Sequence, residues 1–506
     1  MKKPVLDKQI WTRGSERGSV GCECTKDVIL PDMYNDIKRI LRSDVSLRPG
    51  NMSVDNSKFS WDATLFCSIL FVDENDEIKN VDVIIDCSGG CQLDQDNSRI
   101  SFVALPYLES FSVKAVNPRK LGVRARVGVN MKSWAGQLPD PELPDFFNED
   151  DKLSVETRKC ECRHMVMVCA EERDVTVNED IILDKLLPSV GEMLSCSVTI
   201  GPLDLRSGED AVAYSGEAKV GLVYMSDEKK LTVTESRINI SGTVDAQGVS
   251  PDAALLATAF VGKHECQTSE DMSGQNRIVS VGFCYDVFVS AACPVSADYV
   301  TDLYSTDFRT ENSVQIYKCS TPAKNEELSV KRNCSSPFDG SGEILSVTVG
   351  SAVTSFARKD DGVYAFVSSA LTALVRKEDG TVTSVGILDG FDVRIPDCRE
   401  QLANIVICKT EAGTTDGNLY INYEAKLSLL CWDDMQIEAV GKVRAGEADR
   451  IVQGRPLTVY YPAPGETLWQ IAKRYSVTEQ TLEAANHTRE NGDALIIPRR
   501  RVGEGA

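Results

Sequence analysis

An internal repeat constrains the fold of this chain more than any other feature of its sequence. Residues 27–47 (DVILPDMYNDIKRILRSDVSL) align without a gap with residues 180–200 (DIILDKLLPSVGEMLSCSVTI). The apolar positions of the two segments coincide, as in Leu41 with Leu194. An ungapped match of this length, with apolar positions in register, indicates two copies of one fold.

Two further observations extend the repeat. The same offset pairs LFVDENDEI (70–78) with VYMSDEKKL (223–231), and residues 368–385 repeat the apolar run, the acidic turn and the β-branched return a third time. The period of about 150 residues is that of a domain and not the 20 to 50 residues of a solenoid. The sequence therefore predicts three tandem domains of like fold.

Each copy shows the alternation of apolar and polar residues that is typical of half-buried strands. The alternation is clear over residues 63–72, 121–131 and 419–432. One exception lies at residues 33–42, where three apolar residues share a helical face and predict a short helix in copy one. The predicted fold is mainly β, with sandwich-like domains.

Shifts in composition give the predicted domain limits. Linkers are expected at three places: residues 138–151, 293–299 and 444–456. The predicted domains are residues 1–148, 149–293 and 294–452, followed by a small module at 455–500.

Charge and hydropathy exclude several classes of partner. The formal net charge of −21 repels phosphate backbones and anionic lipid surfaces, so nucleic acid is not expected as a partner. No stretch reaches the roughly 18 apolar residues of a membrane span, so direct membrane insertion is not expected either. The first residues lack the apolar run of a signal peptide, and the 17 cysteines are an odd number of scattered residues. We therefore expect an intracellular protein with reduced thiols.

Several motifs resemble a known family. LPDMYNDIKRIL (30–41), NPRKL (117–121) and DLYSTDFRTE (302–311) are similar to SPOCS domains, the repeats of spore-coat morphogenetic proteins of the SipL type in endospore-forming Clostridia. The resemblance covers nearly the whole chain, although copy two departs from it with LDKLLPSVGEML (183–194). It implies a non-enzymatic scaffold that works from the mother-cell cytoplasm at the forespore surface, in the spore coat. The implied partner is the coat morphogenetic ATPase.

The last 50 residues predict a separate small module. Four elements are expected in order: a strand at 457–463, helices at 468–475 and 478–486, and a strand at 494–498. Thr467 and Thr478 stand where they can cap the two helices. This β-α-α-β pattern, with PGETLWQIAKRYSV in its first half, resembles the LysM domain.

In LysM domains generally, a glycan that contains N-acetylglucosamine lies in a groove between two loops. The positions that carry over are Gly465, Glu466 and Thr467 on one side and Asn486, His487 and Thr488 on the other. The second loop is short, so two interpretations stay open: peptidoglycan glycan of the cortex or cell wall, or a protein partner. Intracellular residence favours the protein. Trp469 lies one step off the apolar helical face and is either an exposed aromatic anchor or a core residue.

Metal and catalytic sites are not predicted. Cys22-x-Cys24 and Cys160-x-Cys162, the latter near His164, offer thiolate and imidazole, but neither has a partner pair at the spacing of zinc sites. The chain has three histidines, none beside a nucleophile motif, and no phosphate-binding glycine loop. We expect no catalytic residues, no metal and no cofactor, and therefore a binding protein rather than an enzyme.

Overall fold

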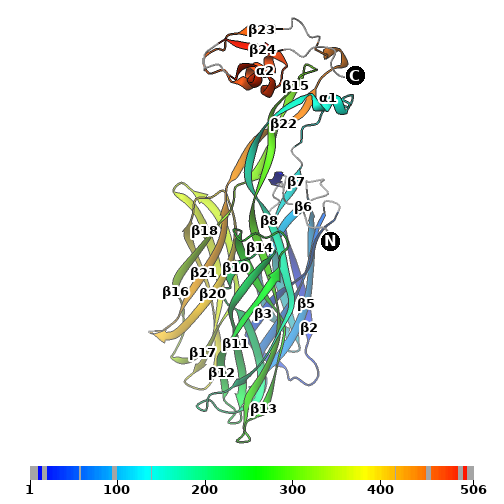
Figure 1. The fold of residues 1–506 in the computed structure, drawn as a ribbon. Helices are drawn as coiled ribbons and strands as arrows, with labels where there is room; N and C mark the ends of the chain where they lie inside the picture. The colour runs from blue at the N-terminus through cyan, green and yellow to red at the C-terminus, as the bar shows by residue number, and fades with distance from the viewer. Residues whose placement is uncertain are drawn as a thin grey trace.

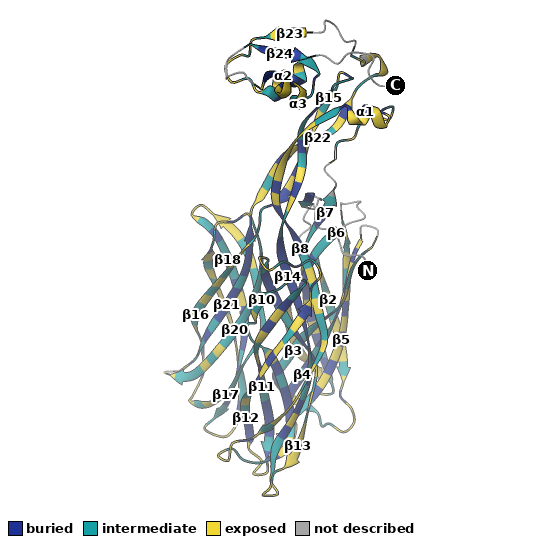
Figure 2. Ribbon diagram, viewed as in Figure 1, coloured by how far each residue is buried: buried dark blue, intermediate teal, exposed yellow. Residues whose placement is uncertain are grey.

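The molecule consists mainly of very long strands, along which buried and exposed residues alternate. The computed structural model describes residues 10–13, 20–55, 58–93, 100–137, 140–415, 417–451, 457–487 and 494–498. Strands make up 75% and helices 5%, which confirms the prediction of a mainly β fold. Figure 1 shows an elongated body with a small helical module at one end, and Figure 2 shows buried and exposed residues alternating along the strands of the body.

The N-terminal part of the chain forms a unit of six main strands, which we call repeat one. Its strands are β2 (Val20–Ile29), β3 (Ile37–Asp55), β4 (Lys58–Asp73), β5 (Ile78–Gln92), β6 (Ile100–Asn117) and β7 (Lys120–Gln137). They form two antiparallel groups of three, β3-β4-β5 and β2-β7-β6. The inward side chains of β4, β5 and β7 share one apolar core, so the two groups pack face to face as a sandwich.

The same strand order recurs twice. Repeat two contains β8 (Val155–Ile182), β9 (Val190–Ile200), β10 (Asp204–Ser207), β11 (Ala211–Ser226), β12 (Leu231–Asp245), β13 (Ala254–Glu270) and β14 (Asn276–Ser305). Repeat three contains β16 (Lys324–Pro337), β17 (Gly342–Lys359), β18 (Gly362–Lys377), β19 (Val382–Ile395), β20 (Glu400–Thr415) and β21 (Asn418–Trp432). The groups of strands are β9-β11-β12 with β8-β14-β13, and β17-β18-β19 with β16-β21-β20; the short β10 also pairs with β11. That each repeat is a separate domain with the predicted limits stays a prediction.

The three repeats meet at a common apolar cluster built from equivalent positions. Leu41, Leu194 and Leu345 each lie at a β-bulge near the start of β3, β9 and β17. A bulge leaves one residue unpaired and redirects its side chain, here into the shared cluster. Six further members come in two matching sets: Leu70, Val223 and Leu374, and Ile78, Leu231 and Val382. Corresponding residues of each repeat therefore hold the body together.

A narrow stalk joins the body to the small module (Figure 1). It contains one end of the long ladder between β8 and β14, and the pair β15 (Glu311–Ser320) with β22 (Asp434–Arg444). The whole β8–β14 ladder runs from Val155 with Ser305 to Ile182 with Ile278. The short β1 (Ile10–Arg13) links β7 to β15. The linker expected at 293–299 is wrong, because those residues lie in β14 and pair with β8 throughout. Pairing of β14 with β8 decides the conformation of this stretch, although Pro294 locally favours a turn.

The helix predicted at residues 33–42 is also wrong. Residues from Ile37 onward belong to β3, and those before them form a turn. The guanidinium of Arg119 donates to the carbonyl oxygens of Leu30, Pro31 and Tyr34 and holds that turn. Pairing with β4 and burial of the apolar side chains decide the conformation, because helix propensity is a weak local preference.

The remaining elements lie around the stalk. They are α1 (Glu149–Leu153), a 3-10 turn at Glu447–Asp449, and the C-terminal module of β23 (Leu457–Tyr460), α2 (Leu468–Tyr475), α3 (Glu479–Asn486) and β24 (Leu495–Pro498). The predicted β-α-α-β order of the module is confirmed. The linker expected at 444–456 is described only as far as residue 451, and its last part lies outside the described residues.

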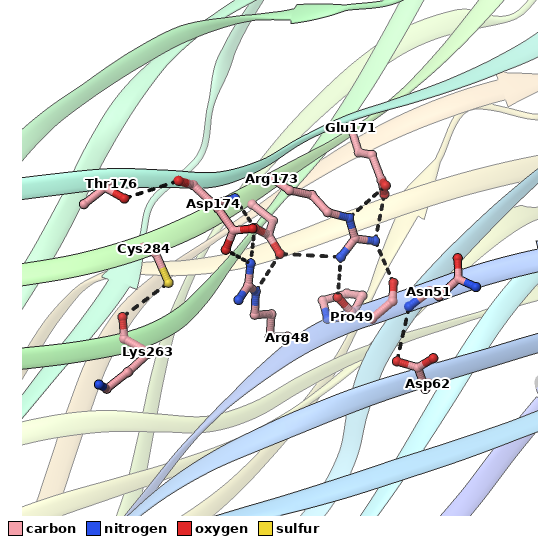
Figure 3. Close-up of polar contacts among 12 residues, drawn as sticks. Arg48, Pro49, Asn51, Asp62, Glu171, Arg173, Asp174, Thr176, Lys263 and Cys284 are labelled. Atoms are coloured by element: carbon pink, nitrogen blue, oxygen red, sulfur yellow. Dashed lines mark hydrogen bonds and ion pairs between the residues drawn. The ribbon is translucent and has the colours of Figure 1, made fainter.

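A buried ion-pair network joins repeats one and two (Figure 3). Asp286 lies at a bulge of β14 and is fully buried. Its carboxylate accepts hydrogen bonds from Nε and Nη2 of Arg48 in β3, both at 2.8 Å, and from the backbone N–H of Asp174 in β8 at 2.8 Å. Arg173 reaches back from β8 and donates to two carbonyl oxygens of β3. A buried carboxylate requires such partners, so the network fixes the orientation of the two repeats.

Candidate functional site

The C-terminal module packs on the end of β14. Trp469 and Ile471 of α2 share an apolar cluster with Tyr304, whose ring centroid lies 5.0 Å from that of Trp469 in an edge-on arrangement. The hydroxyl of Tyr304 donates to the carbonyl oxygen of Val477 at 2.8 Å. The module is therefore docked on the stalk through one face of α2.

Asp302 adds a charged contact to this docking surface. Its carboxylate accepts from the indole N–H of Trp469 at 2.8 Å and from Nζ of Lys473 at 2.5 Å. Burial alone would raise the pKa of Asp302, but the hydrogen bonds from Lys473 and Trp469 outweigh burial and hold the pKa below its usual value. The ionised carboxylate is thus the form that docks the module.

Two threonines begin the helices of the module, as the sequence predicted. The side chain of Thr467 accepts from the backbone N–H of Gln470, and Oε1 of Gln470 accepts from the backbone N–H of Thr467, which completes a capping box. Thr478 caps α3 by accepting from the N–H of Thr481. Such caps satisfy helix N–H groups that have no partner within the helix. The cap at Thr467 sets where the first loop of the predicted groove ends.

The first predicted side of the groove is only partly open. Gly465 is exposed and has a φ of 84°, a conformation that L side chains rarely adopt. The side chain of Glu466 is 8% exposed and pairs with Arg474 at 2.7 Å. It also accepts from the hydroxyl of Tyr460 at 2.7 Å, and this hydrogen bond lowers the pKa of Glu466. Glu466 and the cap Thr467 therefore use their side chains to shape the loop, while Gly465 and Thr467 remain exposed.

The second predicted side contains a correction. Asn486 is buried, and its amide donates to the carbonyl oxygens of Leu482 and Ile496 at 2.7 and 2.8 Å while its oxygen accepts from the N–H of Ile496. Asn486 is therefore not an exposed loop residue, because these bonds tie α3 to β24; its part in a recognition groove stays a prediction. His487 is exposed, with Nδ1–H directed at the carbonyl oxygen of Ala484 at 2.9 Å. Thr488 lies outside the described residues.

Trp469 is a core residue of the docking surface. Only 6% of it is exposed, and both its ring and its indole N–H are engaged by β14. The alternative of an exposed aromatic anchor is therefore wrong. The sequence showed the side chain at the margin of the apolar helical face but not the strand that covers it.

Comparison with known families decides the nature of this module. Residues 463–498 match the family described as LysM domain. The chain carries a LysM domain. This agrees with the sequence prediction of a LysM domain, a domain that suggests binding of peptidoglycan or another glycan. No curated protein and no solved structure matches the chain.

The LysM domain also has an apolar outer face that sequence analysis missed. Leu457, Val459 and Tyr461 follow one another at every second position and are 58%, 54% and 74% exposed. They lie on β23 and the residue after it, and the intervening Thr458 and Tyr460 are less exposed. We call these three side chains the β23 stripe. Alternation in LTVYY was the signal, but it does not say which face is covered.

The structure separates the two members of the second cysteine pair, and Cys162 contacts His164 and Cys319. His164 is fully buried, and its Nε2 accepts the backbone N–H of Trp11 at 3.2 Å. Cys162 is buried, whereas Cys160 is exposed. In the part of the chain that the structure describes, no helix has the length and apolar character needed to cross a membrane.

Proposed function

We propose that this chain is a non-enzymatic adaptor in which three β repeats present a LysM domain that binds a protein partner. The observation that carries the proposal is the β23 stripe. Contiguous exposed apolar side chains on a small domain mark interaction surfaces. Aromatic residues such as Tyr461 are common anchors of these surfaces.

The docking of the LysM domain supports an adaptor role. Contacts of Asp302 and Tyr304 with the domain hold it on the stalk. These contacts occupy α2 and Val477 just after it, whereas the stripe lies on β23 and the residue that follows it. A domain held in this way loses little rotational freedom on binding, which lowers the entropic cost of recognition.

The resemblance of the repeats to SPOCS domains suggests the identity of the partner. We propose a place in the spore coat, at the forespore surface on the mother-cell side, with the coat morphogenetic ATPase bound through the LysM domain and the repeats. The motifs at 30–41, 117–121 and 302–311 support this proposal. The net charge of −21 favours a neutral or basic surface on the partner.

Glycan binding is the second candidate, and the LysM match favours it. Gly465, Thr467 and His487 are the predicted groove positions that are exposed in the described part of the domain. A peptidoglycan chain would contact these loops and not the β23 stripe. The two candidate ligands are therefore expected to bind at two separate surfaces of the domain.

Binding measurements on the full chain distinguish them. Val459→Lys and Tyr461→Ala alter the stripe, His487→Ala alters the loop, and Leu388→Ser is a matched control because Leu388 is an 84% exposed apolar residue of β19. Each protein is tested for binding to the purified coat ATPase and for sedimentation with insoluble peptidoglycan. Removing an anchor residue typically costs 2 kcal/mol or more, which is about thirtyfold in affinity.

We expect the stripe variants to lose ATPase binding and the loop and control variants to keep it. Sedimentation with peptidoglycan should not exceed that of an unrelated protein. Strong sedimentation that His487→Ala abolishes, with ATPase binding absent in every variant, would instead establish the glycan candidate.

A further inference from the structure

Three cysteine side chains converge in repeat one. Cys22 and Cys24 lie on β2 and Cys87 lies on β5, and their sulfur atoms are all within 4.8 Å of one another. The Sγ atoms of Cys22 and Cys24 are 3.3 Å apart. The first pair therefore has a third thiol beside it, although no second pair follows at the spacing of zinc sites. Cys87 is too distant in sequence for a motif to reveal it.

The position of the cluster suits an ion that enters from solvent. β2 lies at the edge of one group of strands and β5 at the edge of the other, so the cluster lies where the two layers of the sandwich meet. Cys22 and Cys24 are half-buried and Cys87 is buried. Residues two apart on a strand point to the same side, so both β2 thiols face Cys87. The sulfur atoms are accessible at one side and shielded at the other.

We propose that Cys22, Cys24 and Cys87 bind one Cu(I) ion as three thiolate ligands. Thiolates are soft ligands that select Cu(I). Structural zinc almost always takes four ligands, and within the described ranges no fourth histidine, cysteine or carboxylate lies within the same distance of all three sulfur atoms. The donor set therefore favours Cu(I), which accepts three sulfur ligands, over zinc.

Binding requires proton release but no change in oxidation state. Cysteine binds a metal ion as the thiolate, so each of the three side chains must lose its proton on binding. Cu(I) replaces the three S–H protons, which pass to solvent, and the resulting complex carries two negative charges. The ammonium of Lys26, on the same side of β2, donates to the carbonyl oxygen of Ile84 on β5 at 2.6 Å. It provides a positive charge beside the site.

The bound ion would link the two layers of repeat one. β2 and β5 belong to different groups of strands, and the described pairings include no ladder between them. A ligand that binds only the folded state stabilises it in proportion to the logarithm of its concentration over Kd. Cu(I) should therefore raise the melting temperature of the intact chain.

Competition for Cu(I) tests the proposal. The reduced full chain is titrated without oxygen against a chromogenic Cu(I) chelator, and X-ray absorption counts the sulfur ligands at one equivalent. Cys22→Ser, Cys24→Ser and Cys87→Ser should each lower the affinity for the first equivalent by more than the roughly 10 to 100-fold that changes around a metal site cost. The expected coordination is three sulfur atoms.

Two control variants separate this site from the other thiols. Cys408→Ser removes a half-buried cysteine of β20, and Cys266→Ser removes a thiol that contacts Cys196. Neither should affect the first equivalent, and equimolar Zn(II) should not displace it. Because Cys87 is buried, thermal melting checks that its variant folds, and the half-buried Cys24 gives an independent test. An unchanged affinity in folded Cys22 and Cys24 variants, or loss on Cys266→Ser, would overturn the proposal.

Discussion

Replacing Asp286 by asparagine tests whether the buried network holds repeats one and two together. The substitution keeps the shape of the side chain but removes the charge that two N–H groups of Arg48 and the N–H of Asp174 contact at 2.8 Å. Removing one partner of a buried ion pair typically costs about 3–5 kcal/mol. Arg48 is 22% exposed and keeps a second carboxylate, Asp174, at 2.6 Å. We therefore expect the lower limit, about 3 kcal/mol.

Urea unfolding of the full chain, followed by circular dichroism, measures this loss. The double variant Arg48→Met with Asp286→Leu removes the buried carboxylate together with its main cation. The carboxylate that loses its partner is then Asp174, which is 73% exposed, so the double variant should be more stable than Asp286→Asn alone. Limited proteolysis should release repeat one from the single variant before the rest of the body unfolds. A loss below about 1 kcal/mol, or a double variant as unstable as the two single changes added together, would refute the role of the network.

Three further predictions concern the LysM domain and the cysteines. The folded pKa of Asp302 lies below its unfolded value, so its contribution to docking is present above about pH 3.9 and is lost as the pH falls through the lower folded value. Hydrogen exchange in α2 should increase over that pH range, and Asp302→Asn should remove this pH dependence. Asn486→Ala should destabilise the domain by about 1–3 kcal/mol, because buried backbone groups lose their partners, whereas His487→Ala should change stability by less than about 0.5 kcal/mol in thermal melts. Elemental analysis of reduced protein should find no zinc held by Cys160 and Cys162, and about one zinc per chain that disappears on mutating both would contradict this.

The sequence predicted those features of the fold that depend on local pattern. Alternation gave the mainly β class, and register between copies gave the repeat, including Leu41 with Leu194. The helix predicted at residues 33–42 was wrong because the spacing of their apolar residues fits a helix as well as a bulged strand. The bulge that turns Leu41 into the common cluster exists only through pairing with β4. Long-range pairing therefore decided the cases that local preference left ambiguous.

The candidate sites divide in the same way. Helix caps depend on residues three apart, so Thr467 and Thr478 were predictable. The burial of Trp469 depends on Asp302, and the thiol cluster depends on Cys87, both distant in sequence. Asn486 was assigned to the groove by its place in a motif, but the partner that makes it structural lies on β24. Sequence motifs locate such residues without showing which groups they bind.

The pairing of β8 with β14 restricts how this protein can change length during evolution. The strands have 28 and 30 residues, so β14 spans up to about 100 Å at 3.3 Å per residue. Deleting one residue would turn every later side chain to the opposite face unless a bulge, such as the one at Asp286, absorbed the change. Length should therefore vary in steps of two residues made in both strands at once, about 7 Å at a time. During evolution, the distance from the LysM domain to the far turns of the body should therefore change only in steps of this size.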